Sequence, residues 1–132
     1  MISDCELNEF LNHHGIESGI YSEFVRRYIP GDCKFVQCSS DGFDYMVSHF
    51  LDKSEKMGYG LIVTNETLET EKTGKLAIGL IEGDDVICLD PQTGRISLWL
   101  IQSGNGECIN VAETFQDFMK TCCENIKMPL SQ

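Results

Sequence analysis

Positive charge is scarce in this sequence. Ten Lys and Arg residues stand against 21 Asp and Glu residues, so the formal net charge is -11. A surface of this sign repels phosphate backbones and anionic lipid headgroups. We therefore expect neither a nucleic acid nor a membrane surface as partner, and the charge favours a basic protein. The alternative is that the excess charge only keeps the protein in solution.

Long apolar runs are absent. No stretch approaches the roughly 20 apolar residues that a membrane-spanning helix requires. The first six residues, MISDCE, carry acid where a signal peptide carries base. The seven cysteines are odd in number and lack the spacing of a disulfide framework; they are residues 5, 33, 38, 88, 108, 122 and 123. The sequence therefore predicts a cytoplasmic protein with reduced cysteines.

Side chains suited to catalysis or metal binding are also few. His13 and His14 lie near the end of a predicted helix, where the helix dipole favours a cation. His49 is close enough to Asp52 for a surface pair. Cysteines 33 and 38 have no second close pair to complete a zinc site, and no glycine-rich phosphate loop is present. We predict no catalytic residue, no metal and no cofactor, and therefore not an enzyme.

The first half of the chain predicts helices. Ser3 and Glu6 form a capping box for a helix that ends at Gly15. Apolar residues with helical spacing then predict two more helices; they are Tyr21, Phe24, Val25 and Tyr28 in one, and Phe43, Met46, Val47, Phe50 and Leu51 in the other. Pro30-Gly31 would stop the second helix and Asp41 would cap the third. A short strand is expected at 34–37.

The second half predicts a β-meander and a closing helix. Strands are expected at 61–64, 76–81, 86–89 and 95–101, with an exposed loop at 65–74. A turn is predicted at 90–94, because its proline and glycine favour one. Asn110 and Glu113 would begin the last helix, with Phe115, Phe118 and Met119 on its apolar face. The fold class is α+β, with N-terminal helices, an antiparallel-dominated sheet and a C-terminal helix packed on it. We expect one domain over 1–132, with a loose tail after about residue 128.

Acidic residues gather around one predicted hairpin, and they are the candidate site. Glu82, Asp84, Asp85 and Asp90 supply the carboxylates, and Trp99 on the next strand is a candidate anchor. Three interpretations are open: a solvated turn, a contact with a partner protein, or a divalent metal site. The spacing fits no known calcium loop. Trp99 is also consistent with a half-buried position in the sheet.

The stretch from about 74 to 120 carries a family resemblance. Three segments contribute to it: KLAIGLIEGD at 75–84, DVICLD at 85–90 with TGRI and LW after it, and NVAETFQDF at 110–118. They resemble the SUKH superfamily, the Smi/Knr/Syd-type domains abundant among bacterial immunity proteins. The resemblance implies a domain that neutralises a toxin delivered by a neighbouring bacterium. Many such toxins are nucleases, whose basic surfaces an acidic protein would cover.

These observations support one hypothesis and leave two alternatives. The first is an immunity-type protein that binds a basic toxin domain and occludes it. The second is a regulatory or scaffold protein of the same fold that binds a host protein. The third is a metal-dependent hydrolase that uses the carboxylates of the hairpin.

Overall fold

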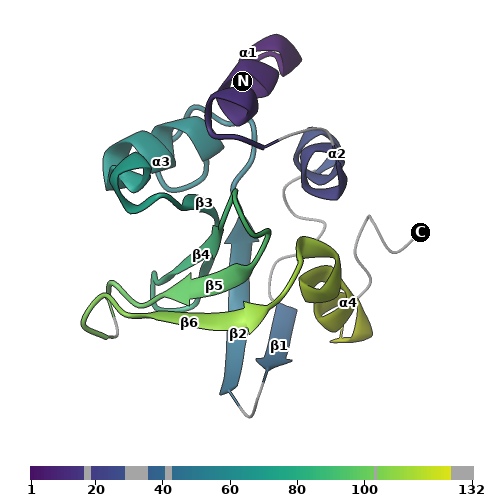
Figure 1. Cartoon of the computed structure of the whole chain (residues 1–132), viewed down its shortest axis with the longest axis vertical. Coiled ribbons are helices and arrows are strands. Elements are labelled where there is room, and N and C mark those ends of the chain that lie inside the picture. Colours follow the sequence, from purple (N-terminus) through teal and green to yellow (C-terminus); the bar gives the residue numbers. More distant parts are fainter. Residues whose placement is uncertain (17–18, 29–35, 41–42, 103, 126–132) are drawn as a thin grey trace.

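The computed structural model describes residues 1–16, 19–28, 36–40, 43–102 and 104–125, and it has an α+β fold (Figure 1). Two helices come first, then two strands, a third helix with a short 3-10 helix, four strands and a last helix. The elements are α1 (Asp4–His13), α2 (Ile20–Arg27), β1 (Val36–Ser40), β2 (Phe43–Phe50), α3 (Leu61–Leu68), η1 (Thr70–Thr73), β3 (Leu76–Ile81), β4 (Val86–Leu89), β5 (Ile96–Trp99), β6 (Cys108–Ala112) and α4 (Phe115–Asn125).

The six strands form one antiparallel sheet in which every neighbour along the chain is also the neighbour in space. The predicted meander is therefore confirmed. Helix α4 contacts both edge strands, β1 and β6, as well as α2. The sheet is thus coiled enough for its two edges to reach the same helix (Figure 1). Helices α1 and α3 lie together at the opposite end of the molecule from strand β1 (Figure 1).

One cluster of buried apolar side chains joins the helices to the sheet. Its centre is aromatic: the Phe24 ring lies 5.0 Å from the Phe50 ring, and Phe50 lies 6.2 Å from Phe118. These three side chains come from α2, β2 and α4 and are almost fully buried. Edge-to-face aromatic pairs of this kind add to the free energy gained from burial alone.

Several local predictions are confirmed. Ser3 caps α1 by accepting the amide of Glu6 at 3.1 Å, and the four predicted apolar residues of α2 and its C-cap Tyr28 are all buried. Strands β3 and β4 have the predicted bounds. In the 90–94 turn, Gly94 has φ +81° and its amide donates to the carbonyl of Asp90 at 2.7 Å. Positive φ explains why glycine stands there.

The predicted third helix is wrong, because 43–50 is strand β2. Tyr45, Val47 and Phe50 are the buried residues, so the spacing is two and then three. A β-bulge between Val47 and His49 causes this change of spacing, since an extra residue moves the following side chains to the other face. Strand alternation interrupted by a bulge therefore resembles helical periodicity.

The predicted strand at 61–64 is also wrong, because these residues begin helix α3. Leu61, Thr64 and Asn65 are buried, which is the i, i+3, i+4 pattern of a helix face. Burial outweighs the weak helix propensity of Ile62 and Val63. The predicted loop at 65–74 is instead the end of α3 followed by η1.

The start of the last helix differs from the prediction. Asn110 lies in strand β6, which the sequence did not predict, and Thr114 caps α4 by accepting the amide of Asp117 at 3.0 Å. Phe115, Phe118 and Met119 are buried as expected. The predictions for Pro30-Gly31, Asp41 and the tail after 128 lie outside the described residues, and the predicted strand at 34–37 is described only from Val36 onward.

Candidate functional site

The β3–β4 turn exposes two of the predicted site residues. Glu82 and Asp84 are both exposed, and neither forms an ion pair with a described residue. Asp84 has φ +67° after Gly83 at φ +96°. Consecutive positive φ values are typical of the tight hairpin turns that fit the twist of antiparallel strands, and aspartate tolerates this conformation better than most residues.

Asp85 does not belong to this exposed surface, which corrects the sequence-based assignment. Its side chain is buried, with 2% of the residue exposed. One carboxylate oxygen accepts the amide of Gln102 at 2.7 Å and so ties the start of β4 to the segment after β5. A carboxylate used in this way stabilises the hairpin end and is not available to a partner protein.

Asp90 lies at the other end of β4, so the four acids do not form one cluster. Its carboxylate accepts the amides of Gln92 at 2.9 Å and Thr93 at 3.4 Å. The hydrogen bond from Gln92, with a smaller contribution from Thr93, holds the pKa of Asp90 below its ordinary value. Asp90 therefore shapes the 90–94 turn.

Trp99 is half-buried at the end of β5, opposite Val86. Its ring packs against the core cluster, and its indole nitrogen lies beside Gly106 of the β5–β6 connection. The β3–β4 and β5–β6 connections leave the sheet at the same end, since consecutive strands are antiparallel. The structure therefore brings Glu82, Asp84 and Trp99 to one end of the sheet, where Asp85 is also present but buried, and it places Asp90 at the other end. We call Glu82 and Asp84 the turn acids.

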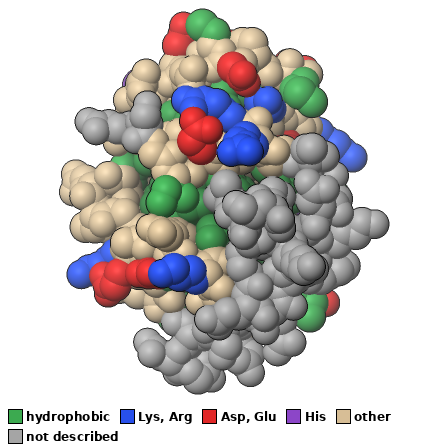
Figure 2. Space-filling view, turned by 90° about the vertical axis from the view of Figure 1, so that its right-hand side faces the viewer, with side chains coloured by type: hydrophobic (Ala, Val, Ile, Leu, Met, Phe, Trp, Pro, Cys, Tyr) green, Lys and Arg blue, Asp and Glu red, His purple; other side chains and the backbone are tan. Residues whose placement is uncertain are grey.

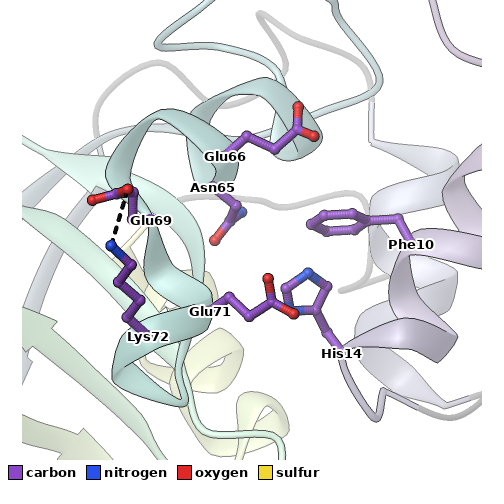
Figure 3. Close-up of a pocket in the computed structure, with 7 residues that line it drawn as sticks. All are labelled: Phe10, His14, Asn65, Glu66, Glu69, Glu71 and Lys72. Atoms are coloured by element: carbon purple, nitrogen blue, oxygen red, sulfur yellow. Dashed lines mark hydrogen bonds and ion pairs between the residues drawn. The ribbon is translucent and has the colours of Figure 1, made fainter.

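A second candidate site was not predicted. It is a cleft of about 280 Å³ between α1 and the α3–η1 segment (Figure 3). We call it the α1–η1 cleft. Seven residues line it: Phe10, His14, Asn65, Glu66, Glu69, Glu71 and Lys72. The sequence gave no signal for it, because its two sides are about 50 residues apart in the chain and 65–74 was expected to be a loop.

One side of the cleft is formed by two rings from α1 and its end. The Phe10 and His14 ring centroids lie 4.4 Å apart in a tilted arrangement. Burial lowers the pKa of His14 below its ordinary value, and the neighbouring His13 lowers it further, while Glu71 partly opposes this shift. This shift favours the uncharged form of His14, so this side of the cleft presents an aromatic ring and an imidazole.

Asn65 forms the base of the cleft, and its amide connects three segments. Its nitrogen donates to the carbonyls of Leu61 at 2.8 Å and Ala77 at 2.9 Å. Its oxygen accepts the amide of Ala77 at 2.8 Å and the hydroxyl of Thr70. All four hydrogen-bonding positions of the amide are used. This network joins α3, η1 and β3 and fixes the position of the acidic side of the cleft.

The other side of the cleft carries three carboxylates with different partners. Glu69 forms an ion pair with Lys72 at 3.2 Å, and Glu71 lies 3.0 Å from His13 Nε2. Glu66 forms no ion pair with any described residue. Figure 3 shows Glu71 extending toward His14 and Phe10 facing Asn65 across the cleft. The cleft thus combines aromatic rings with uncompensated negative charge.

Charges elsewhere are arranged differently. Figure 2 shows a face on the α2 side where Lys and Arg side chains lie next to Asp and Glu side chains. Arg26 pairs with Glu23 at 3.1 Å on α2, and Arg95 pairs with Glu113 at 3.0 Å. The acid excess is therefore not uniform, because these carboxylates are neutralised while Glu66 and the turn acids are not.

The remaining candidates have structural roles. The expected pair between His49 and Asp52 is wrong: His49 Nε2 lies 2.7 Å from the Gly58 carbonyl oxygen, and Asp52 accepts the amide of Ser54 at 2.7 Å. Burial raises the pKa of the Cys88 thiol to about 12, so this cysteine is protonated and unreactive at neutral pH. Among the described residues, no three His, Cys, Asp or Glu side chains are grouped so as to hold a metal ion.

Comparison of the chain with protein-family models, curated proteins and solved structures gives no match. No helix within the described ranges is both long enough and apolar enough to cross a bilayer.

Proposed function

We propose that this chain is a binding protein for a basic partner, and specifically an immunity-type protein that neutralises a toxin domain by covering its positively charged surface. The observation that carries the proposal is the uneven charge pattern. Glu66 and the turn acids are exposed and form no ion pair with a described residue, whereas Glu23 and Glu113 elsewhere are paired. Uncompensated surface charge attracts an oppositely charged partner and accelerates its encounter.

The proposal of an immunity-type role comes from the resemblance to the SUKH superfamily. Its segments at 75–90 and 93–99 form β3, β4 and β5 with their turns, and the segment at 110–118 spans the end of β6 and the start of α4. A toxin that acts on nucleic acid requires a basic surface to hold its substrate. A protein with a net charge of -11 that binds this surface would exclude the substrate by occupancy and by repulsion.

Growth rescue tests the proposal. Where a large secreted protein is encoded beside this chain, its C-terminal domain is the toxin to test, expressed in bacteria with and without the chain. We expect growth arrest by the toxin domain alone and recovery on co-expression, together with a stoichiometric complex on size exclusion. Arrest that persists although the chain is expressed and folded would contradict the proposal.

A further inference from the structure

The α1–η1 cleft has the chemical features of a site for one cationic side chain. Phe10 offers an aromatic face, and Glu66 and Glu71 offer carboxylates on the other side. A cation over an aromatic ring is attracted by the negative face of the ring, and a carboxylate binds its N–H groups directly. The lowered pKa of His14 reduces its competition for the carboxylates, whereas His13 contacts Glu71 at 3.0 Å.

The cleft is small, which limits its occupant. Its volume of about 280 Å³ is just below the range of about 300 to 1,000 Å³ that is typical of pockets for whole small-molecule ligands. A single long side chain that enters from a partner protein suits a cleft of this size. Glu69 is paired with Lys72 and Glu71 lies 3.0 Å from His13, whereas Glu66 forms no ion pair with a described residue, so the charge of the cleft favours a cation at Glu66.

We propose that the α1–η1 cleft binds an arginine side chain of the basic partner protein. The guanidinium plane stacks on the Phe10 ring, and its N–H groups donate to the carboxylates of Glu66 and Glu71. This inference rests on the proposed function, because the partner supplies the arginine.

Arginine fits this cleft better than lysine for a geometric reason. The guanidinium is flat, so it stacks on a ring through its face while its edge donates several hydrogen bonds in one plane. An ammonium group has no such face and keeps its water more strongly. The turn acids carry comparable charge, but neither of them lines the α1–η1 cleft.

The test uses N-acetyl-arginine amide as the probe and the full chain labelled with nitrogen-15. We expect amide chemical shifts to change around Phe10, Glu66 and Glu71, with saturation at millimolar probe. The citrulline analogue has the same shape without the charge, and the lysine analogue has the charge without the plane. We expect no binding of the first and weaker binding of the second.

Two variants of equal charge provide the matched comparison. Glu66→Gln with Glu71→Gln removes two carboxylates from the cleft, and Glu82→Gln with Asp84→Asn removes two from the turn. The first variant should bind the probe about fivefold more weakly, the size of effect typical of an exposed ion pair, and the second should bind it as the original chain does. Phe10→Leu should abolish the preference for arginine over lysine while the amide spectrum stays folded.

Three results would overturn the inference: shift changes centred on the turn acids, equal weakening in both variants, or equal binding of citrulline. Growth rescue separates this inference from the proposed function. Full neutralisation of the toxin by the Glu66→Gln, Glu71→Gln variant would refute the role of the cleft and leave the proposed function standing. Failure of the unaltered chain to neutralise the toxin would refute the proposed function.

Discussion

Asn65 fixes the position of the acidic side of the α1–η1 cleft. It is 3% exposed and uses its whole amide to join α3, η1 and β3. A buried backbone group that loses its partner costs more free energy than the bond contributes, because water cannot replace the partner. The position of η1, and with it the position of Glu71, therefore depends on this side chain.

Asn65→Ala should lower the free energy of unfolding by roughly 3 kcal/mol, because it removes the side-chain partner of the peptide N–H and C=O of Ala77 and one of the two acceptors of the Thr70 hydroxyl. Urea denaturation followed by circular dichroism measures the change. Thr67→Ala on the exposed side of α3 is the control and should change stability by less than about 0.5 kcal/mol. Equal effects of the two variants would contradict the structural role of Asn65.

Two adjacent aspartates at the β3–β4 turn differ in exposure. Asp84 and Asp85 are adjacent in the sequence, yet Asp84 is exposed and Asp85 is buried against the Gln102 amide. Asp84 lies in the turn at φ +67°, whereas Asp85 directly precedes β4, so the two side chains leave the backbone in different surroundings. Only Asp84 can therefore contribute to the charge that a partner meets.

At the scale of elements, the 52–60 connection is more ordered than a simple loop. The amide of Asp52 donates to the carbonyl of Tyr59 at 2.9 Å, and the amide of Leu61 donates to the carbonyl of Asp52 at 2.8 Å. His49 stacks on Tyr59 with ring centroids 4.7 Å apart. The connection closes on itself at Gly60, which packs directly against the Ser54 carbonyl. This closure sets where α3 begins.

Gly60→Ala should destabilise the protein by roughly 2 to 3 kcal/mol, because the added methyl group would collide with the Ser54 carbonyl oxygen and with the Val63 side chain. Gly58→Ala is the matched comparison: its φ of +88° is unfavourable for alanine, but the methyl group meets nothing within 4 Å. We expect a cost of about 1 kcal/mol there. Thermal unfolding of both variants measures the order, and a larger loss for Gly58→Ala would contradict the close packing at Gly60.

At the scale of the whole molecule, the net charge of -11 acts over a longer range than any contact. Exposed charges influence association up to about the Debye length, roughly 10 Å at 0.1 M salt. The turn acids lie at the β3–β4 turn, and Glu66 lies on α3 beside the α1–η1 cleft. Unpaired carboxylates on two parts of the surface can therefore contribute to the steering of a partner.

Glu82→Lys with Asp84→Lys should slow association with the toxin domain of the proposed function by about tenfold at low salt. Reversing the charge of these two unpaired side chains weakens electrostatic steering. The melting temperature should fall only slightly, since both side chains are exposed and lysine is only moderately less favourable than aspartate at the φ of +67° of position 84. Stopped-flow association at 0.02 M and 0.5 M salt measures the effect, which should disappear at the higher concentration. A rate constant that is unchanged at low salt would remove the β3–β4 turn from the interface.

The sequence by itself determined the elements whose signals are local. The Ser3 cap, the amphipathic face of α2, the bounds of β3 and β4 and the 90–94 turn all follow from side chains within a few residues of one another. Hydrogen-bonding capacity, apolar spacing and the preference of glycine for positive φ act over that range. The α+β class followed from the same signals.

Only the tertiary structure decided the rest. The bulge after Val47 exists because β2 pairs with β3, and α3 is helical because burial of Leu61, Thr64 and Asn65 outweighs β-branched propensity. The burial of Asp85 and the meeting of Phe10 with Glu66 likewise depend on segments distant in the chain. Such contacts depend on which faces pack together in three dimensions, and this packing cannot be predicted from residue spacing along the chain.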